Sequence, residues 1–338
     1  MAYQYENVKL DKSMYRRTGA AFSQVLEQQD PSQQYKGTEL EGLDAFQRQL
    51  KRFDIKVKGP DSDYVEKFFS CADSAVLFPE YISRCVYQGV QEANVLPHIV
   101  ATVTNIDGLD YRTITSVNDD TAQMKQVAEG AVIPTTTIHV QSNLVKLRKR
   151  GRMMVASYEA IRRQKLDLFS IALRQIGANI AAMQMKDAVD VLINGDGNEN
   201  EVDYIESKSA DILTYDDLIN LWASFRPHEM STLLVSEDMM GQLLKLPELH
   251  DPAGGMNFAG TGKLVTPLGA TVLCVRDMPA GKIVAVDKRY ALEMVECGGV
   301  SVEYDKLIDR QLERAAITVT YGFAKMFYDA SLMLETDF

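Results

Sequence analysis

The sequence predicts an α+β protein organised around one unusually long helix. Residues 157–193 contain no proline and one glycine, and their apolar side chains recur at alternating spacings of three and four. Before this run, residues 107–155 are rich in Thr, Val and Ile and predict two strands. After it, short helical and strand patterns alternate to the C-terminus. These three observations together favour helices and sheets in separate parts of the chain.

The composition is that of a folded globular protein. The chain has 338 residues, 46% of them apolar, and a formal charge of −11 from 36 Lys+Arg and 47 Asp+Glu. These values exclude wholesale disorder and suggest about two domains. The acidity argues against a protein whose main task is to coat nucleic acid. No window predicts a transmembrane helix, and the first residues lack the apolar core of a secretory signal.

Residues 1–75 are polar and predict an arm with one amphipathic helix. The apolar residues of that helix recur at helical spacing: Leu43, Phe46, Leu50 and Phe53. A lone amphipathic helix cannot bury its stripe by itself. We expect the stripe to be covered either by the body of the protein or by a neighbouring subunit.

The next unusual segment is a long two-stranded excursion. Strands are predicted at 111–117 and from 134 to 140 onwards, with polar chain between them. An isolated two-stranded hairpin is marginally stable in water. We therefore expect this segment to contact something outside itself.

The excursion returns through a run of basic residues: Lys146, Arg148, Lys149, Arg150 and Arg152. In an acidic protein, a local basic patch more often pairs with acidic surface than with nucleic acid. We expect acidic partners in the same chain or between subunits. Reversal of the charge at Arg148 and Arg150 together is then predicted to impair assembly without unfolding the subunit.

The long helix carries its own start and stop signals. Ser157 can cap the N-terminus, and Glu159 suits the first turn. Asn194-Gly195 predicts a left-handed C-cap. A continuous helix over this run would span about 55 Å at a rise of 1.5 Å per residue. Since the stripe breaks at Asp187, a single helix crossing the body is favoured over a coiled coil.

Two segments resemble ligand-binding motifs, but each lacks residues that the motif requires. The loop 254–263 lacks the lysine position of a phosphate loop, and residues 196–207 lack the glycine and glutamate of a calcium loop. The four histidines and four cysteines form no recognisable metal or nucleophile pattern. The sequence predicts neither an enzyme nor a cofactor or metal site.

Four local sequences, in this order, resemble tailed-phage major capsid proteins of the Hong Kong ninety-seven fold. They are Ala-Glu-Gly-Ala-Val-Ile-Pro at 128–134, the helix entry at 153–159, Asp-Ala-Val-Asp-Val-Leu-Ile-Asn-Gly-Asp-Gly at 187–197, and the strand and turn series from 267 to 300. The resemblance covers about residues 76–335. It implies the fold of that family, with an N-terminal arm, an extended β-hairpin loop, a long spine helix, a peripheral domain and an axial domain.

The resemblance also implies a division of the chain. The expected parts are the arm at 1–75, the peripheral domain at 76–106, the extended loop at 107–155, the spine helix and further peripheral domain at 156–212, the axial domain at 213–299, and peripheral C-terminal strands at 300–338. Some relatives join their shells through a lysine-to-asparagine bond. Lys125 is the only lysine in the distal excursion, but no motif fixes a partner for it.

The implied function is structural. The chain is expected to assemble with itself into hexamers and pentamers of an icosahedral virion shell, formed in the bacterial cytoplasm around packaged double-stranded DNA that it does not read by sequence. Portal, scaffolding and possibly decoration proteins are the implied partners. The candidate contacts between subunits are the stripe Leu43, Phe46, Leu50 and Phe53, the loop residue Glu129, and the basic run.

Two alternatives stay open at this stage. An encapsulin-like nanocompartment shell would share the fold and enclose protein cargo. An α/β enzyme with an internal long helix would instead be a small oligomer with a polar-lined pocket.

Overall fold

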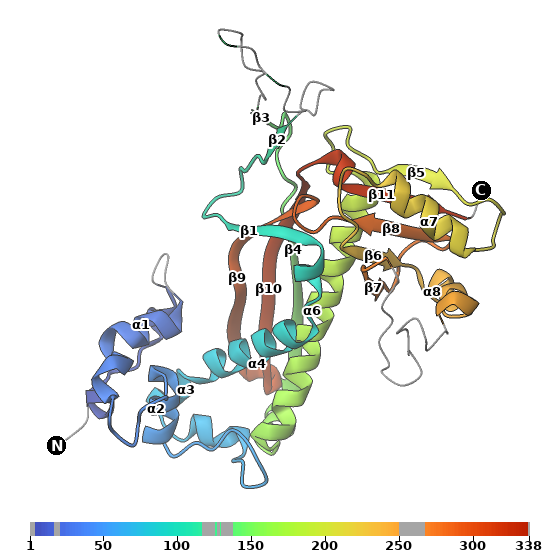
Figure 1. Cartoon of the computed structure of the whole chain (residues 1–338). Coiled ribbons are helices and arrows are strands. Elements are labelled where there is room, and N and C mark those ends of the chain that lie inside the picture. The colour runs from blue at the N-terminus through green and yellow to red at the C-terminus, as the bar shows by residue number, and fades with distance from the viewer. Residues whose placement is uncertain are drawn as a thin grey trace. The chain divides into compact units, whose positions relative to one another are not determined.

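The chain is described here from a computed structural model, which Figure 1 shows as a ribbon. The structure describes residues 4–16, 21–116, 126, 129, 138–249 and 268–336. It contains two compact units. Unit 1 consists of Met1–Ala93, Lys149–Ile180 and Gly298–Val319, and unit 2 of Asn94–Arg148, Ala181–Cys297 and Thr320–Phe338. Within the described ranges, no helix has the length and apolarity needed to cross a membrane.

The N-terminal segment folds as a succession of short helices in unit 1. They are the 3₁₀ turns Gln4–Asn7, Lys12–Arg16, Ser32–Tyr35 and Val65–Phe69, and the α-helices α1 (Phe22–Gln29), α2 (Ala45–Arg52), α3 (Ala72–Ala75) and α4 (Phe78–Ala93). The predicted amphipathic helix is α2. The Asp44 side chain accepts from the Gln47 amide at 2.8 Å, and the Gln47 side chain accepts in return from the Asp44 amide. This capping box starts the helix at Ala45, within the span of the predicted apolar stripe.

A buried ion pair holds this segment together. Arg48 of α2 donates to Asp30 at 2.6 Å, and neither side chain is exposed to solvent. Phe46 and Leu50 are buried in the core of unit 1, so the chain's own body covers part of the stripe. The sequence predicts an arm with one amphipathic helix, and the described part of 1–75 contains several short helices whose apolar residues pack in the unit 1 core. The physical reason is that a neighbouring segment of the same chain supplies the apolar surface that the stripe needs.

The long helix is interrupted near its predicted start. Tyr158–Arg162 forms the short helix α5, and the continuous helix α6 runs from Leu166 to Asn194. Between them the chain turns and then forms an isolated β-bridge from Lys165 to Tyr64. In this bridge the Val65 amide donates to the carbonyl of Gln164 and the Leu166 amide donates to the carbonyl of Asp63. Ser157 acts as an N-cap, as expected, and caps α5: its hydroxyl oxygen accepts a hydrogen bond from the Ala160 amide. The C-terminal prediction is confirmed, since Gly195 has a φ of +76°.

Two glycines let α4 and α6 approach within backbone contact. A Cβ placed on Gly89 of α4 would lie 2.1 Å from the carbonyl oxygen of Arg174. A Cβ on Gly177 of α6 would lie 2.1 Å from the carbonyl oxygen of Val86. The single glycine of the long helical run therefore marks a close crossing in unit 1.

A four-stranded sheet has the order β1-β9-β10-β4. Its strands are β1 (Val100–Asn105), β9 (Leu292–Leu307), β10 (Leu312–Lys325) and β4 (Arg148–Ser157). In β10, burial alternates over most of the strand, with Ala315, Ile317 and Val319 buried. This alternation is the pattern expected of a strand with one face on a core.

Unit 2 also contains a five-stranded sheet of order β5-β11-β8-β6-β7. The strands are β5 (Asp203–Glu206), β6 (Thr232–Val235), β7 (Thr271–Cys274), β8 (Lys282–Val286) and β11 (Ser331–Glu335), and the helices α7 (Tyr215–Ser224) and α8 (Glu237–Leu243) contribute to the same core. The sequence grouped all of 300–338 with peripheral strands. In the structure, β11 lies between β5 of the expected peripheral part and β8 of the expected axial part, and its residues Met333 and Leu334 are buried.

The predicted excursion contains a separate antiparallel pair. It consists of β2 (Ile114–Ser116) and β3 (Ile138–Val140), with Ile114 opposite Val140. This confirms a strand on each limb. Lys125 and the glycine-rich loop 254–263 lie outside the described residues.

Candidate functional site

The candidate functional site is the base of the excursion in unit 2. Its outgoing limb is held by a buried carboxylate, Glu293 of β9, which is 4% exposed. Three hydroxyls donate to this carboxylate: those of Thr104, Tyr111 and Thr113, with the Tyr111 contact at 2.7 Å. Hydrogen bonds to a charged acceptor are stronger than neutral ones. The outgoing limb is thereby fixed to the sheet through Tyr111 and Thr113, and the third hydroxyl comes from β1 itself.

The returning limb is fixed by amides. The Gln141 side chain donates to the Lys325 carbonyl at 2.8 Å and accepts from Asn198 at 2.9 Å. The backbone amides of Gln141 and Val145 donate to Thr113 and Tyr111 carbonyls, which joins the two limbs. The base of the excursion is thus a hydrogen-bonded clamp.

Beyond the clamp, the paired strands carry exposed apolar side chains. Ile114, Ile138 and Val140 are 51%, 67% and 62% exposed. Ile138 and Val140 lie two residues apart and therefore on the same face of β3. A hairpin with this much exposed apolar surface is typical of a segment that packs against another molecule.

The loop after α6 completes the clamp. Asp196 is buried and accepts from the Lys325 amide at 3.0 Å. In this acidic segment after α6, Asp196 is buried rather than solvated, because its carboxylate satisfies a buried backbone donor. No group of three or more His, Cys, Asp or Glu side chains that could hold a metal occurs in the described ranges.

Lys325 is the most unusual group at this site. Its side chain is buried and donates to the Leu192 carbonyl at 3.4 Å, at the C-terminal end of α6. Burial lowers the pKa of Lys325 to about 8, against the opposing effect of nearby carboxylates led by Asp203 and Asp196.

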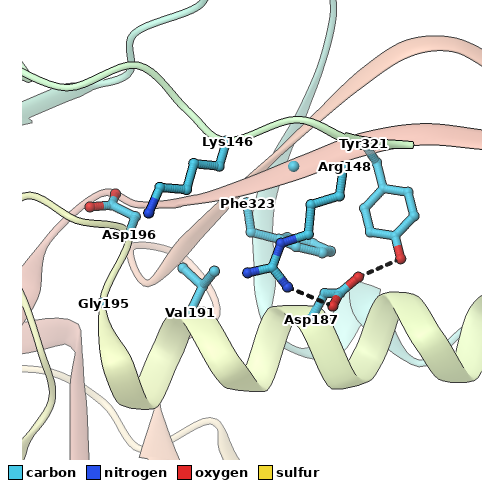
Figure 2. A pocket seen from close by; sticks show the side chains of 9 residues that line it. Lys146, Arg148, Asp187, Val191, Gly195, Asp196, Tyr321 and Phe323 are labelled. Carbon is cyan, nitrogen blue, oxygen red and sulfur yellow. Dashed lines mark hydrogen bonds and ion pairs between the residues drawn. The ribbon is translucent and has the colours of Figure 1, made fainter. Parts of the chain in front are cut away.

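The residues of the basic run differ in their partners within the structure. Arg148 donates to Asp187 at 3.0 Å and to Asp190 at 3.3 Å, and Asp187 also accepts from the Tyr321 hydroxyl at 2.7 Å. Figure 2 shows Arg148, Asp187 and Tyr321 in the lining of a pocket to which Lys146 also contributes. Arg148 therefore has its acidic partners within its own unit.

The remaining predicted residues have different surroundings. Lys149 and Arg152 are exposed on β4, and Arg150 is half-buried there. Glu129 is exposed. Leu43 packs beside a small cluster of Tyr5, Tyr35 and Leu40, and Phe53 is half-buried against the unit 1 core. The role of these residues between subunits stays a prediction.

The clamp residues were missed by the sequence reasoning. Glu293 stands in an otherwise apolar run, Leu-Glu-Met-Val, and this contrast is the one local signal that could have identified it. Gln141 and Lys325 carry no such signal, because their partners lie far away in the sequence.

Comparison with known proteins agrees with this architecture. A family model described as phage capsid protein matches residues 141–329, which is more than half of the chain. No curated protein sequence matches the chain.

Among solved structures, the capsid of a native GTA particle is similar, with a TM-score of 0.53, 16% identity and coverage of 71% of this chain and 89% of that one. A virus-like particle from Pyrococcus furiosus has a TM-score of 0.51 and 14% identity, and covers 76% of this chain and 98% of that one. The satellite phage P4 procapsid, in a structure that includes its size determination protein, has a TM-score of 0.51 and 7% identity over 76% and 91% of the two chains.

At these identities, the structural likeness establishes the fold. The match over residues 141–329 establishes the family. The chain belongs to the phage capsid protein family, has the Hong Kong ninety-seven fold, and is a structural subunit of a virion capsid.

Proposed function

We propose that this chain is the major capsid subunit that forms hexamers and pentamers and closes them into an icosahedral shell around packaged double-stranded DNA. The observation that carries the proposal is the clamped excursion with an exposed apolar face, found in a member of a capsid family. A segment that is held firmly at its base and exposes apolar side chains on its paired strands is suited to contact a neighbouring subunit.

The role of the shell is enclosure. A formal charge of −11 is consistent with a wall that confines DNA without binding it tightly. In this role the subunit forms part of the wall of the shell and does not recognise a DNA sequence.

The wider setting is part of the same proposal. We place assembly in the bacterial cytoplasm, with a portal and a scaffolding protein as partners, and decoration proteins as a possible addition on the closed shell. The support is family membership together with an apolar hairpin whose burial needs a second molecule.

The test is negative-stain electron microscopy of the purified chain with light scattering for mass. Angular closed shells, or free hexamers and pentamers, are the expected result. A dimer or tetramer that forms no curved assembly at high concentration would overturn the proposal. Nuclease-protected DNA inside shells from infected cells supports the phage role, whereas a co-purified protein cargo would point to a nanocompartment.

A further inference from the structure

Each of the two larger sheets has one terminal strand that carries charged residues, and these two strands have charges of opposite sign. In the described topology the terminal strands are β1 and β4 of one sheet and β5 and β7 of the other. β1 (Val-Ala-Thr-Val-Thr-Asn) and β7 (Thr-Val-Leu-Cys) carry no charged residue. β4 carries four basic residues and no acidic one, and β5 (Asp-Tyr-Ile-Glu) carries two acidic residues and no basic one. The charged ends are therefore confined to one strand of each sign.

The charges on these strands are available for contact. Lys149 and Arg152 of β4 are exposed, and neither makes an ion pair within the described residues. Asp203 and Glu206 of β5 are likewise exposed and form no ion pair there. Tyr204, between them, is 58% exposed. Both strands thus present exposed charges, without an ion pair in the described residues, beside a backbone edge that has a strand on one side only.

An open strand edge is a template for pairing with another chain. Like charges placed opposite each other destabilise a strand pair, and opposite charges stabilise it. Pairing of β4 with a second β4, or of β5 with a second β5, is therefore disfavoured. Among the terminal strands that carry charge, β4 of one subunit with β5 of another is the combination in which opposite charges face each other.

We propose that the β4 edge of one subunit pairs with the β5 edge of a second copy, with Lys149 and Arg152 facing Asp203 and Glu206. The inference rests on the proposed function, since it assigns one contact within the capsid rings. This contact is heterologous, because it joins two different surfaces of the same chain. Heterologous contacts close into rings when the rotation between subunits allows it. Arg148 is excluded from this role because Asp187 and Asp190 already engage it.

The test uses two charge-reversed full-length chains. K149E/R152E makes the exposed charges on both edges acidic, and D203K/E206K makes both basic. Each alone is expected to lose ring and shell formation by about tenfold or more relative to wild type, a factor that corresponds to about 1.4 kcal/mol. The chain with all four substitutions is expected to recover assembly, because the opposite charges face each other again.

A mixture gives a sharper result. In equal amounts the two reversed chains can alternate around a ring, with every contact between opposite charges. Rings with an even number of subunits can close in this way, and rings of five cannot. We therefore expect the mixture to recover hexamers and to lack pentamers by electron microscopy.

Two control variants distinguish loss of the proposed contact from misfolding and from a general effect of net charge. Because Asp203 lies near enough to Lys325 to influence its pKa, E206K alone serves as a milder acidic-edge variant. K51E/K288E reverses two exposed lysines elsewhere and changes the net charge by the same amount as K149E/R152E. It should assemble as wild type, and all variants should melt near the wild-type temperature.

The outcomes distinguish this inference from the proposed function. Failure of the wild-type chain to form any ring or shell overturns the proposed function itself. Normal wild-type shells together with unimpaired reversed chains overturn the edge pairing alone. Impaired single variants that recover neither in the mixture nor in the chain with four substitutions also overturn it.

Discussion

Glu293 shows what a single buried charge can contribute to this fold. Its carboxylate is the common acceptor for three hydroxyls that come from the strand before the excursion and from the outgoing limb. Within the described part of the chain no cation pairs with this carboxylate, and a buried carboxylate of that kind is stable only when its lone pairs are satisfied by hydrogen bonds. If the carboxylate is removed, the three hydroxyls lose their acceptor. A substitution therefore removes the hydrogen bonds and also leaves buried hydroxyls without a partner.

Replacement of Glu293 by Leu is expected to lower the free energy of unfolding by about 1–3 kcal/mol, the cost of leaving buried polar groups unsatisfied. Chemical denaturation measures this. E303Q, an exposed position on the same strand, is the matched control and should stay within about 0.5 kcal/mol of wild type. An E293L chain as stable as E303Q would show that the clamp contributes nothing.

Lys325 predicts a specific dependence of stability on pH. Its pKa is about 8 in the folded chain, below its ordinary value of 10.5. Between these two pH values the unfolded chain binds more protons than the folded chain, so stability rises with pH. Below pH 8 both forms are protonated, and the full penalty for the buried charge is present.

Relative to K325M, which removes the charge, wild type should therefore gain about 3 kcal/mol of stability as the pH rises from 8 to 10.5. Denaturation of both chains across this range measures the difference. A difference that is constant with pH would contradict the assignment.

At the scale of elements, the crossing of α4 and α6 depends on having no side chain at two positions. Alanine normally favours a helix over glycine by up to about 1 kcal/mol. At Gly89 and Gly177 the added Cβ would instead meet a backbone carbonyl at 2.1 Å, and the two helices would have to separate. Backbone contact therefore overrides helix propensity here.

We expect G89A and G177A each to be destabilised by about 1–3 kcal/mol, the usual range for overpacking. Gly241 of α8 is the matched control, because a Cβ there meets nothing within 4 Å and alanine should stabilise the chain slightly. Thermal unfolding of the three variants measures the contrast. A stabilised G177A would mean that the helices do not cross at this point.

The paired strands β2 and β3 carry a prediction about assembly. The double substitution of Ile138 and Val140 by Ser should leave subunit stability within about 0.5 kcal/mol, because both side chains are exposed in the subunit. It should strongly reduce shell yield, because burial of each apolar group contributes about 0.8 kcal/mol per CH₂. Val103→Ser, at a half-exposed position on β1, is the control. Unchanged shell yield in the double variant would remove this hairpin face from the interface.

At the scale of the whole molecule, net charge sets the relation to DNA. With a formal charge of −11, the chain should hold DNA by enclosure, with little phosphate contact. Phosphate contacts weaken steeply with salt. Disrupted shells should therefore release DNA at moderate salt, as measured by sedimentation. Retention at about 1 M salt would contradict this expectation.

Sequence by itself determined the long helix, its C-cap at Gly195, the short helix α2 and the strand on each limb of the excursion. All of these are encoded by local periodicity and by residues with strong conformational preferences. The order of these elements also identified the family, which the match over 141–329 bears out.

Only the tertiary structure decided where α6 starts, because the interruption comes from backbone hydrogen bonds to residues 63–65, about a hundred positions earlier. The same holds for the folding of the N-terminal segment around Arg48 and for the placement of β11 in the second sheet. It also decided that Arg148 pairs with acidic residues of α6, while Lys149, the next residue, makes no ion pair within the described residues. Each of these outcomes depends on a partner that is remote in the chain, and local patterns carry no information about which remote segment arrives.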